Sequence, residues 1–74
     1  MYYHNIGSNG FDVLLGKHES LSVTVNRITA ICLTHGVEVK SVTGCNEGDF
    51  TKVTIEFTDD HTEDTLDSIL QELS

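Results

Sequence analysis

Residues 2–16 read YYHNIGSNGFDVLLG, and this stretch decides the fold class. Tyr2–Ile6 and Phe11–Leu15 are rich in aromatic and branched side chains, which is typical of β-strands. The residues between them, GSNG at 7–10, tolerate the positive φ angles of tight turns, and Asn-Gly is a strong hairpin signal. Alternate residues of Phe11–Leu15 are apolar, so one face of this strand points to a core. The chain therefore opens with a β-hairpin.

A helix is predicted next, after the polar loop GKHES. It begins at Ser20 or Ser22 and runs to about His35, since Gly36 is a residue typical of the position after a helix. The apolar residues at helical spacing are Leu21, Val25, Ile28 and Cys32, with Ile31 beside them. Residues 20–25 also alternate like a strand, so the start of the helix stays open between the two structures.

Two more strands and a second helix complete the pattern. Val37–Val42 has strand character, residues 44–49 supply a turn, and Phe50–Phe57 is the clearest strand in the chain. A last helix begins after a cap at Asp60 or Thr62, and Asp60 to Glu63 has the spacing of a capping box. Its apolar stripe, at helical spacing, is Leu66, Ile69, Leu70 and Leu73.

The predicted order is β-β-α-β-β-α in a single domain, residues 1–74. Each helix has one apolar stripe, and the clearest strand has one apolar face, so burying them together gives two layers. We expect an α+β two-layer sandwich, in which two helices cover one face of a four-stranded antiparallel sheet.

Residues 13–73 resemble an ACT domain, and the small regulatory subunit of acetohydroxyacid synthase is the nearest likeness. The segments that carry the resemblance are VLLGKHES, VNRITAICLTHG, VEVKSVTG, TKVTIEFTD and DTLDSILQEL. The resemblance implies a ferredoxin-like sheet, in which the family places a last strand beside the first. In this chain the hairpin would put Met1–Ile6 in that position, as an N-terminal strand in place of the usual last one.

The resemblance also implies a place for an amino-acid ligand, at the turn between the first family strand and the first helix. There the family uses a glycine-containing turn, whose backbone N–H groups meet a carboxylate. Here Lys17–Ser22 contains neither glycine nor proline, and Glu19 would repel a carboxylate. Whether a small ligand binds the turn at 16–22 stays open.

The net charge of −8 lies in one half of the chain. Residues 1–40 are neutral overall, whereas residues 41–74 contain nine acids and a single cation, Lys52. Such a chain would repel phosphate, so we expect no direct nucleic-acid binding. The acids either keep a small domain soluble or face a protein partner with a basic surface. The candidate partner-binding residues are Asp59, Asp60, Glu63, Asp64, Asp67 and the exposed aromatic Tyr2.

Motifs for metal binding or catalysis are weak. Two candidates are Cys32-x-x-His35 and the cluster of Asp59-Asp60-His61 with Glu63-Asp64, and both lack the second ligand pair that a structural zinc site needs. No nucleophile is linked to a base, so we expect neither an enzyme nor a cofactor. The N-terminus MYYHN has neither the basic region nor the apolar core of a signal peptide, so we expect none there, and no apolar run is long enough to span a membrane. We expect a cytoplasmic protein with reduced cysteines, Cys32 in the core and Cys45 in a polar loop.

These features favour a non-enzymatic, acidic protein-binding module that acts as an inhibitor or regulatory subunit of a larger protein. Its size and charge are similar to those of phage inhibitors of host defence systems, anti-CRISPR proteins among them. One alternative is an ACT-like domain that senses an amino acid, regulates a biosynthetic enzyme and forms a homodimer. A second alternative is a DNA mimic, in which carboxylates stand in for phosphates.

Overall fold

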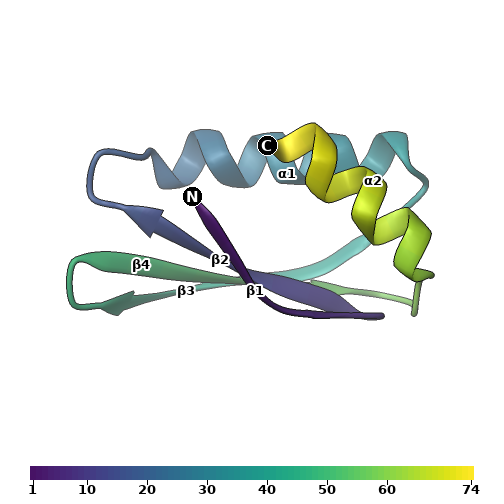
Figure 1. The fold of residues 1–74 in the computed structure, drawn as a ribbon, viewed down its shortest axis with the longest axis horizontal. Coiled ribbons are helices and arrows are strands. Elements are labelled where there is room, and N and C mark those ends of the chain that lie inside the picture. Colours follow the sequence, from purple (N-terminus) through teal and green to yellow (C-terminus); the bar gives the residue numbers. More distant parts are fainter.

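The computed structural model describes all of residues 1–74 and contains four strands and two helices (Figure 1). The elements in chain order are β1 (Tyr2–Gly7), β2 (Gly10–Gly16), α1 (Leu21–Thr34), β3 (Val39–Glu47), β4 (Phe50–Phe57) and α2 (Glu63–Leu73). The strands form one antiparallel sheet in the order β1-β2-β4-β3. The predicted α+β class, the element order and the antiparallel sheet are confirmed.

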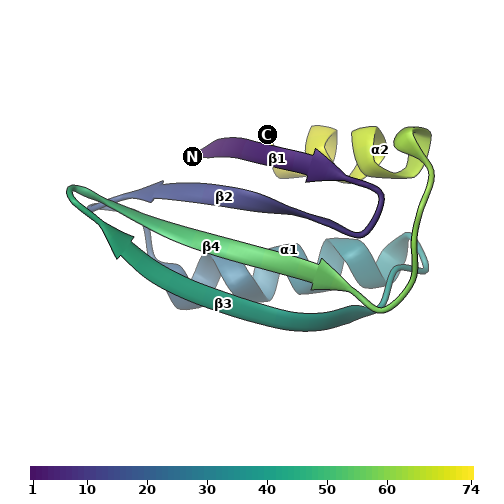
Figure 2. The ribbon, with the colours of Figure 1, turned by 90° about the horizontal axis from the view of Figure 1, so that it is seen from below.

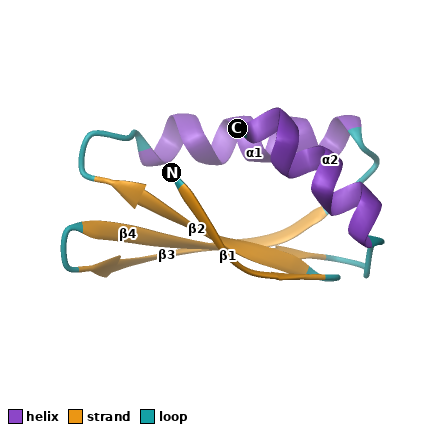
Figure 3. Cartoon of the chain, in the orientation of Figure 1, coloured by secondary structure: helices purple, strands orange, loops and turns teal.

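Both helices lie on the same side of the sheet, and the other face of the sheet is uncovered (Figure 3). Seen from the sheet side, α2 lies behind β1, and α1 lies behind β4 and β3 (Figure 2). β1 pairs with β2 along the edge that β4 does not occupy, so the predicted N-terminal hairpin is confirmed. The two sheet edges are β1 on one side and β3 on the other.

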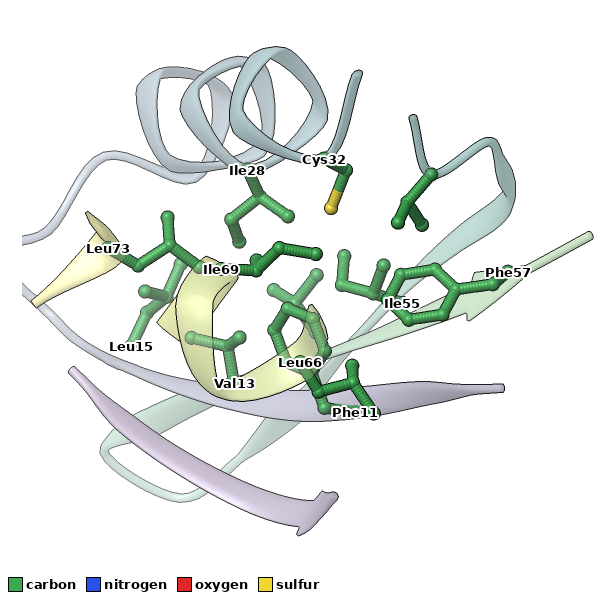
Figure 4. Packing of buried hydrophobic residues seen from close by; sticks show 12 residues of the cluster. Phe11, Val13, Leu15, Ile28, Cys32, Ile55, Phe57, Leu66, Ile69 and Leu73 are labelled. Atoms are coloured by element: carbon green, nitrogen blue, oxygen red, sulfur yellow. The ribbon is translucent and has the colours of Figure 1, made fainter. Parts of the chain in front are cut away.

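The core lies between the sheet and the helices (Figure 4). Its twelve buried residues are Phe11, Val13, Leu15, Ile28, Cys32, Val37, Val53, Ile55, Phe57, Leu66, Ile69 and Leu73. Half of them come from alternate positions of β2 and β4, because successive side chains of a strand point to opposite faces. Leu21 was expected on the apolar stripe of α1, but it is 46% exposed at the first position of the helix.

The helix ends settle two questions that the pattern left open. Ser20 caps α1, since its hydroxyl accepts a hydrogen bond from the backbone N–H of Val23 at 3.3 Å, so the stretch from Leu21 is helix. Gly36 follows the end of α1 with φ 72°, as predicted. Thr62 caps α2 by accepting from the N–H of Thr65 at 3.3 Å. The capping box from Asp60 to Glu63 is therefore wrong.

The third strand is longer than the prediction. β3 begins at Val39 and continues to Glu47, and only Gly48 and Asp49 form the turn into β4. The expected turn residues around Gly44 pair instead with β4, which is long enough to accompany them as far as Phe50. Cys45 therefore lies in a strand, opposite Lys52, and not in a loop.

The backbone of β4 passes close to Gly10 of β2. A Cβ atom at Gly10 would lie 2.0 Å from the carbonyl oxygen of Ile55, and the backbone there has φ 153°. Any larger residue must push two central strands apart.

We therefore expect Gly10→Ala to lower the free energy of unfolding by about 1–3 kcal/mol, as overpacked cores do. Gly44→Ala is the matched control, because a Cβ at Gly44 would meet nothing within 4 Å. Urea denaturation of both variants measures the difference. Equal stability of the two would contradict the close approach of β4 at Gly10.

The two cysteines differ in access to solvent. Cys32 is fully buried, and burial raises the pKa of its thiol to about 11, whereas Cys45 is exposed. The thiolate is the reactive form of cysteine, so Cys32 is protected both by its burial and by its raised pKa.

We expect one thiol per native chain to react with Ellman's reagent at neutral pH and two after denaturation. The Cys45→Ser variant should show no fast reaction, and two fast thiols in the native protein would contradict the burial of Cys32.

Candidate functional site

The candidate site begins with a bulge in β1. The register with β2 shifts between His4 and Gly7, so Asn5 and Ile6 together stand opposite the single residue Phe11. Asn5 has φ 50°, a left-handed conformation that asparagine tolerates better than most residues. Its side-chain Nδ2 donates a 2.7 Å hydrogen bond to Oδ2 of Asp12. This bond fixes the bulge to the neighbouring strand.

The bulge changes the direction of Ile6. In a regular strand Ile6 would share the face of Tyr2 and His4, because side chains alternate. Instead Ile6 lines a hollow of about 460 Å³ on the side of α2, and 52% of its surface is exposed. The residues around this hollow are Ile6, Gly7, Ser8, His61, Glu63, Leu66 and Asp67. The floor is thus partly apolar and the rim is partly acidic.

Two backbone hydrogen bonds join the hairpin turn to the segment that leads into α2. The N–H of His61 donates to the carbonyl of Ser8, and the N–H of Phe57 donates to the carbonyl of Asn9, both at 2.7 Å. The imidazole of His61 packs edge-on against the ring of Phe57, with centroids 5.6 Å apart. The start of α2 is therefore held against the turn, and the hollow lies between them.

Two of the acidic residues predicted from the sequence, Glu63 and Asp67, line this hollow. The other three are their neighbours along the chain, Asp59 and Asp60 before α2 and Asp64 in its first turn. All five are exposed, and none of them forms an ion pair. The ion pairs of the molecule are Met1 amine–Glu19, His35–Glu72, Lys40–Glu56 and Lys52–Glu47. The charge of these five acids is therefore not neutralised within the chain.

We call the five acids together with Ile6 and Leu66 the acidic end. Glu63 and Asp64 lie in the first turn of α2, where the positive end of the helix dipole stabilises carboxylates. This gives part of the charge a structural role. The lack of cationic neighbours is not explained by the dipole, because each nearby carboxylate repels the others.

Tyr2 does not belong to this surface. It pairs with Leu14 and points to the uncovered face, because its neighbour Tyr3 packs against Phe11 on the core side. It also begins β1, whereas the acidic end lies at the far end of that strand, roughly 15–20 Å away at 3.3 Å per residue. Its 64% exposure confirms the expected exposed tyrosine and keeps it a separate candidate contact.

The turn that would bind an amino acid in the ACT family is occupied by its own side chain. Oε1 of Glu19 accepts the N–H of Gly16 at 3.0 Å and pairs with the Met1 amine at 3.0 Å. The Gly16 hydrogen bond, followed by the Met1 amine, lowers the pKa of Glu19. A ligand carboxylate would have to displace Glu19 from the Gly16 N–H.

The same residues show what the sequence pattern missed. Ile6 was expected only as a strand residue and His61 only as a member of a weak metal cluster, yet both line the hollow. Asn5 was the signal for Ile6, since an asparagine inside an aromatic and branched strand is a frequent site of left-handed backbone. Nothing in the sequence placed His61 beside Ile6. No group of three or more His, Cys, Asp or Glu residues is placed to share a metal ion.

Comparisons with known proteins give no family. No protein-family model matches the chain, and neither the curated proteins nor the solved structures contain a match. Neither helix combines the length and apolar composition needed to traverse a lipid bilayer. The function is therefore argued from the acidic end and its surroundings.

The hydrogen bond between Asn5 and Asp12, which fixes the bulge, makes the stability of the fold depend on pH. Asp12 is 7% exposed, and its pKa lies below the ordinary 3.8. The main cause is the hydrogen bond that Asn5 donates to its carboxylate. Burial alone would raise this pKa, but Thr54, Lys52 and His4 lower it further. A group whose pKa is lower in the folded state stabilises the fold above its unfolded pKa of about 3.9. That stabilisation is lost as the pH falls through the lower folded value.

We expect Asp12→Asn to lower the free energy of unfolding at pH 7 by about 1 kcal/mol, since a charge-assisted hydrogen bond is replaced by a neutral one. The difference from wild type should shrink below about pH 4 as Asp12 takes up its proton. Urea denaturation across the acid range measures it. Glu56→Gln is a control for loss of a carboxylate on the same face. A difference that does not change with pH would contradict a bulge held by the ionised Asp12.

Proposed function

We propose that this chain is a non-enzymatic protein-binding module whose acidic end docks on a basic surface of a larger protein, as an inhibitor or regulatory subunit. The observation that carries the proposal is a set of five exposed acids without an ion pair, two of which line a hollow that also contains the apolar side chains of Ile6 and Leu66. Other acids of the chain are paired, Glu19 with the Met1 amine and Glu56 with Lys40.

The chemistry of the hollow fits a basic side chain. Ile6 and Leu66 offer apolar surface to the methylene stem of lysine or arginine, and Glu63 and Asp67 lie on the rim for the charged head. The remaining acids extend the negative field beyond the hollow, which speeds the encounter with a basic partner. A single charged patch with an apolar centre is a common design of protein interfaces.

The ferredoxin-like arrangement, with β1 in place of the last strand of an ACT domain, supports a regulatory domain as the origin of this module. Amino-acid sensing is less favoured, because Glu19 already accepts from the Gly16 N–H. Inhibition of a host defence system, as by anti-CRISPR proteins, fits the size and charge. A DNA mimic would use the same acidic end, and DNA would then compete with the partner.

The experiment is affinity capture from a bacterial lysate with quantitative mass spectrometry, using wild type and the variant Glu63→Lys/Asp67→Lys. We expect a dominant partner to be retained by the wild type and lost by the variant, with association at least about tenfold slower. If one of the twenty amino acids raises the melting temperature of the free protein in a thermal-shift screen, the result would instead support amino-acid sensing.

The matched control is Glu38→Lys/Asp49→Lys, which replaces two exposed acids without an ion pair, changes the net charge from −8 to −4 just as the first variant does, and leaves the hollow intact. Retention of the partner by this control assigns binding to the acidic end. Equal loss in both variants would reduce the effect to net charge and overturn the proposal. Ile6→Ser tests the apolar floor without any change of charge.

A further inference from the structure

The hairpin turn between β1 and β2 places an exposed asparagine directly before a glycine. Asn9 is the last residue of the turn and is exposed, whereas Gly10 is the buried first residue of β2. The fold itself requires glycine at this position, because a Cβ there would lie 2.0 Å from the carbonyl oxygen of Ile55. The amide side chain is therefore followed by a backbone nitrogen with no side chain beside it, and such a nitrogen can approach the amide carbon closely.

Water also has access to the bond between these two residues. Asn9 and Gly10 line a second hollow, of about 130 Å³, which also contains the carboxylates of Asp12 and Glu56. This space is far larger than the roughly 15 Å³ that one water molecule needs. Ionised carboxylates accept hydrogen bonds from water, so the hollow is polar enough to be hydrated beside the Asn9 amide.

The other three asparagines of the chain, Asn5, Asn26 and Asn46, are restrained, and each is followed by a residue that carries a side chain. Nδ2 of Asn5 donates to Asp12 at 2.7 Å. Asn26 lies inside α1, where backbone N–H groups point along the helix axis into hydrogen bonds. Oδ1 of Asn46, in β3, accepts from the hydroxyl of Thr51 at 3.4 Å. Asn9 therefore differs from all three in its neighbour.

We propose that Asn9 is a site of spontaneous deamidation, at which the chain converts to aspartate and isoaspartate. Asparagine is a thermolabile residue. The backbone nitrogen of Gly10 attacks Cγ of Asn9 and gives up its proton, and ammonia leaves as a succinimide ring closes. One water molecule then opens the ring, so the amide and water become a carboxylic acid and ammonia. Opening at Cγ gives aspartate, and opening at the α-carbonyl carbon gives isoaspartate, whose main chain runs through Cβ and Cγ.

The two products differ in their effect on the structure. Aspartate keeps the backbone, so the carbonyl of residue 9 still accepts the 2.7 Å hydrogen bond from the N–H of Phe57. In isoaspartate that carbonyl becomes a free carboxylate, and the main chain is one carbon longer where the backbone of β4 leaves no room. The neighbouring bond from the N–H of His61 to the carbonyl of Ser8 then loses its fixed acceptor. Isoaspartate therefore releases the start of α2 from the hairpin turn.

This modification site goes beyond the proposed function, and no partner is needed to detect it. Where the acidic end docks on a partner, isoaspartate at residue 9 limits the lifetime of the docking surface, because Gly7 and Ser8 of the turn line its hollow. The native contacts slow the reaction, since the hydrogen bond from Phe57 holds the Asn9 carbonyl. Conversion is therefore slower in the folded chain than in the unfolded one.

The first test is incubation of the wild type and Asn9→Gln at physiological temperature and mildly alkaline pH, folded and in urea, followed by peptide mapping with mass spectrometry. We expect the mass gain of an amide-to-acid exchange at residue 9 in the wild type, faster in urea, and none at the other three asparagines of the folded protein. Asn9→Gln is the matched control, because its longer side chain closes a larger ring more slowly. Folded wild type that keeps its Asn9 amide while the chain in urea converts, or loss of the amide in Asn9→Gln at the wild-type rate, overturns the proposal.

The second test separates the two products. Isoaspartate is quantified by the methyl groups that an isoaspartyl methyltransferase transfers from S-adenosylmethionine, and hydrogen exchange is measured at the amides of Phe57 and His61. We expect both amides to exchange faster in the isoaspartate fraction and to keep the wild-type rate in Asn9→Asp. Unchanged exchange in the isoaspartate fraction overturns the predicted release of α2. Equally fast exchange in Asn9→Asp overturns it too, since the added charge would then suffice.

Discussion

The pairing of β2 with β4 determines where every other element can lie. Phe11 stands opposite Ile55 and Val13 opposite Val53, and all four point into the same core. Because side chains alternate along a strand, a slip of one residue would turn one of these apolar faces to solvent. The tight approach at Gly10 opposes such a slip, since other registers would bring a Cβ against the β4 backbone. Both helices then cover the one apolar face that this register creates.

A polar contact on the uncovered face shapes the hollow near α2. Asp12 lies on the central strand β2, its carboxylate holds Asn5, and Asn5 in turn bends β1 so that Ile6 reaches the acidic end. The backbone bonds from His61 and Phe57 to the hairpin turn hold the other wall of the hollow. The proposed docking surface is thus built by residues of β1, β2 and α2 that are distant in sequence.

The periodic parts of the sequence were sufficient to predict the six elements and the hairpin, because burial of an apolar face imposes a period of 2 or 3.6 residues. The apolar periodicity did not predict the strand residues that are exposed to solvent. Gly44 to Glu47 lie on an exposed edge and carry no apolar alternation, so their strand was not visible. The five acids were found because they are neighbours in sequence. Ile6 was missed because a bulge reverses the side to which later residues point, and that reversal depends on the contact with Asp12.

Both tyrosines of the chain, Tyr2 and Tyr3, belong to β1, and there is no tryptophan. Tyr3 packs edge-on against Phe11, with ring centroids 6.2 Å apart, whereas Tyr2 faces solvent. The near-ultraviolet circular dichroism and the intrinsic fluorescence of this protein therefore report mainly on whether β1 is attached to β2. A molecule that had lost only its first strand would appear unfolded by these optical signals, although its helices and the pairing of β2, β4 and β3 were intact.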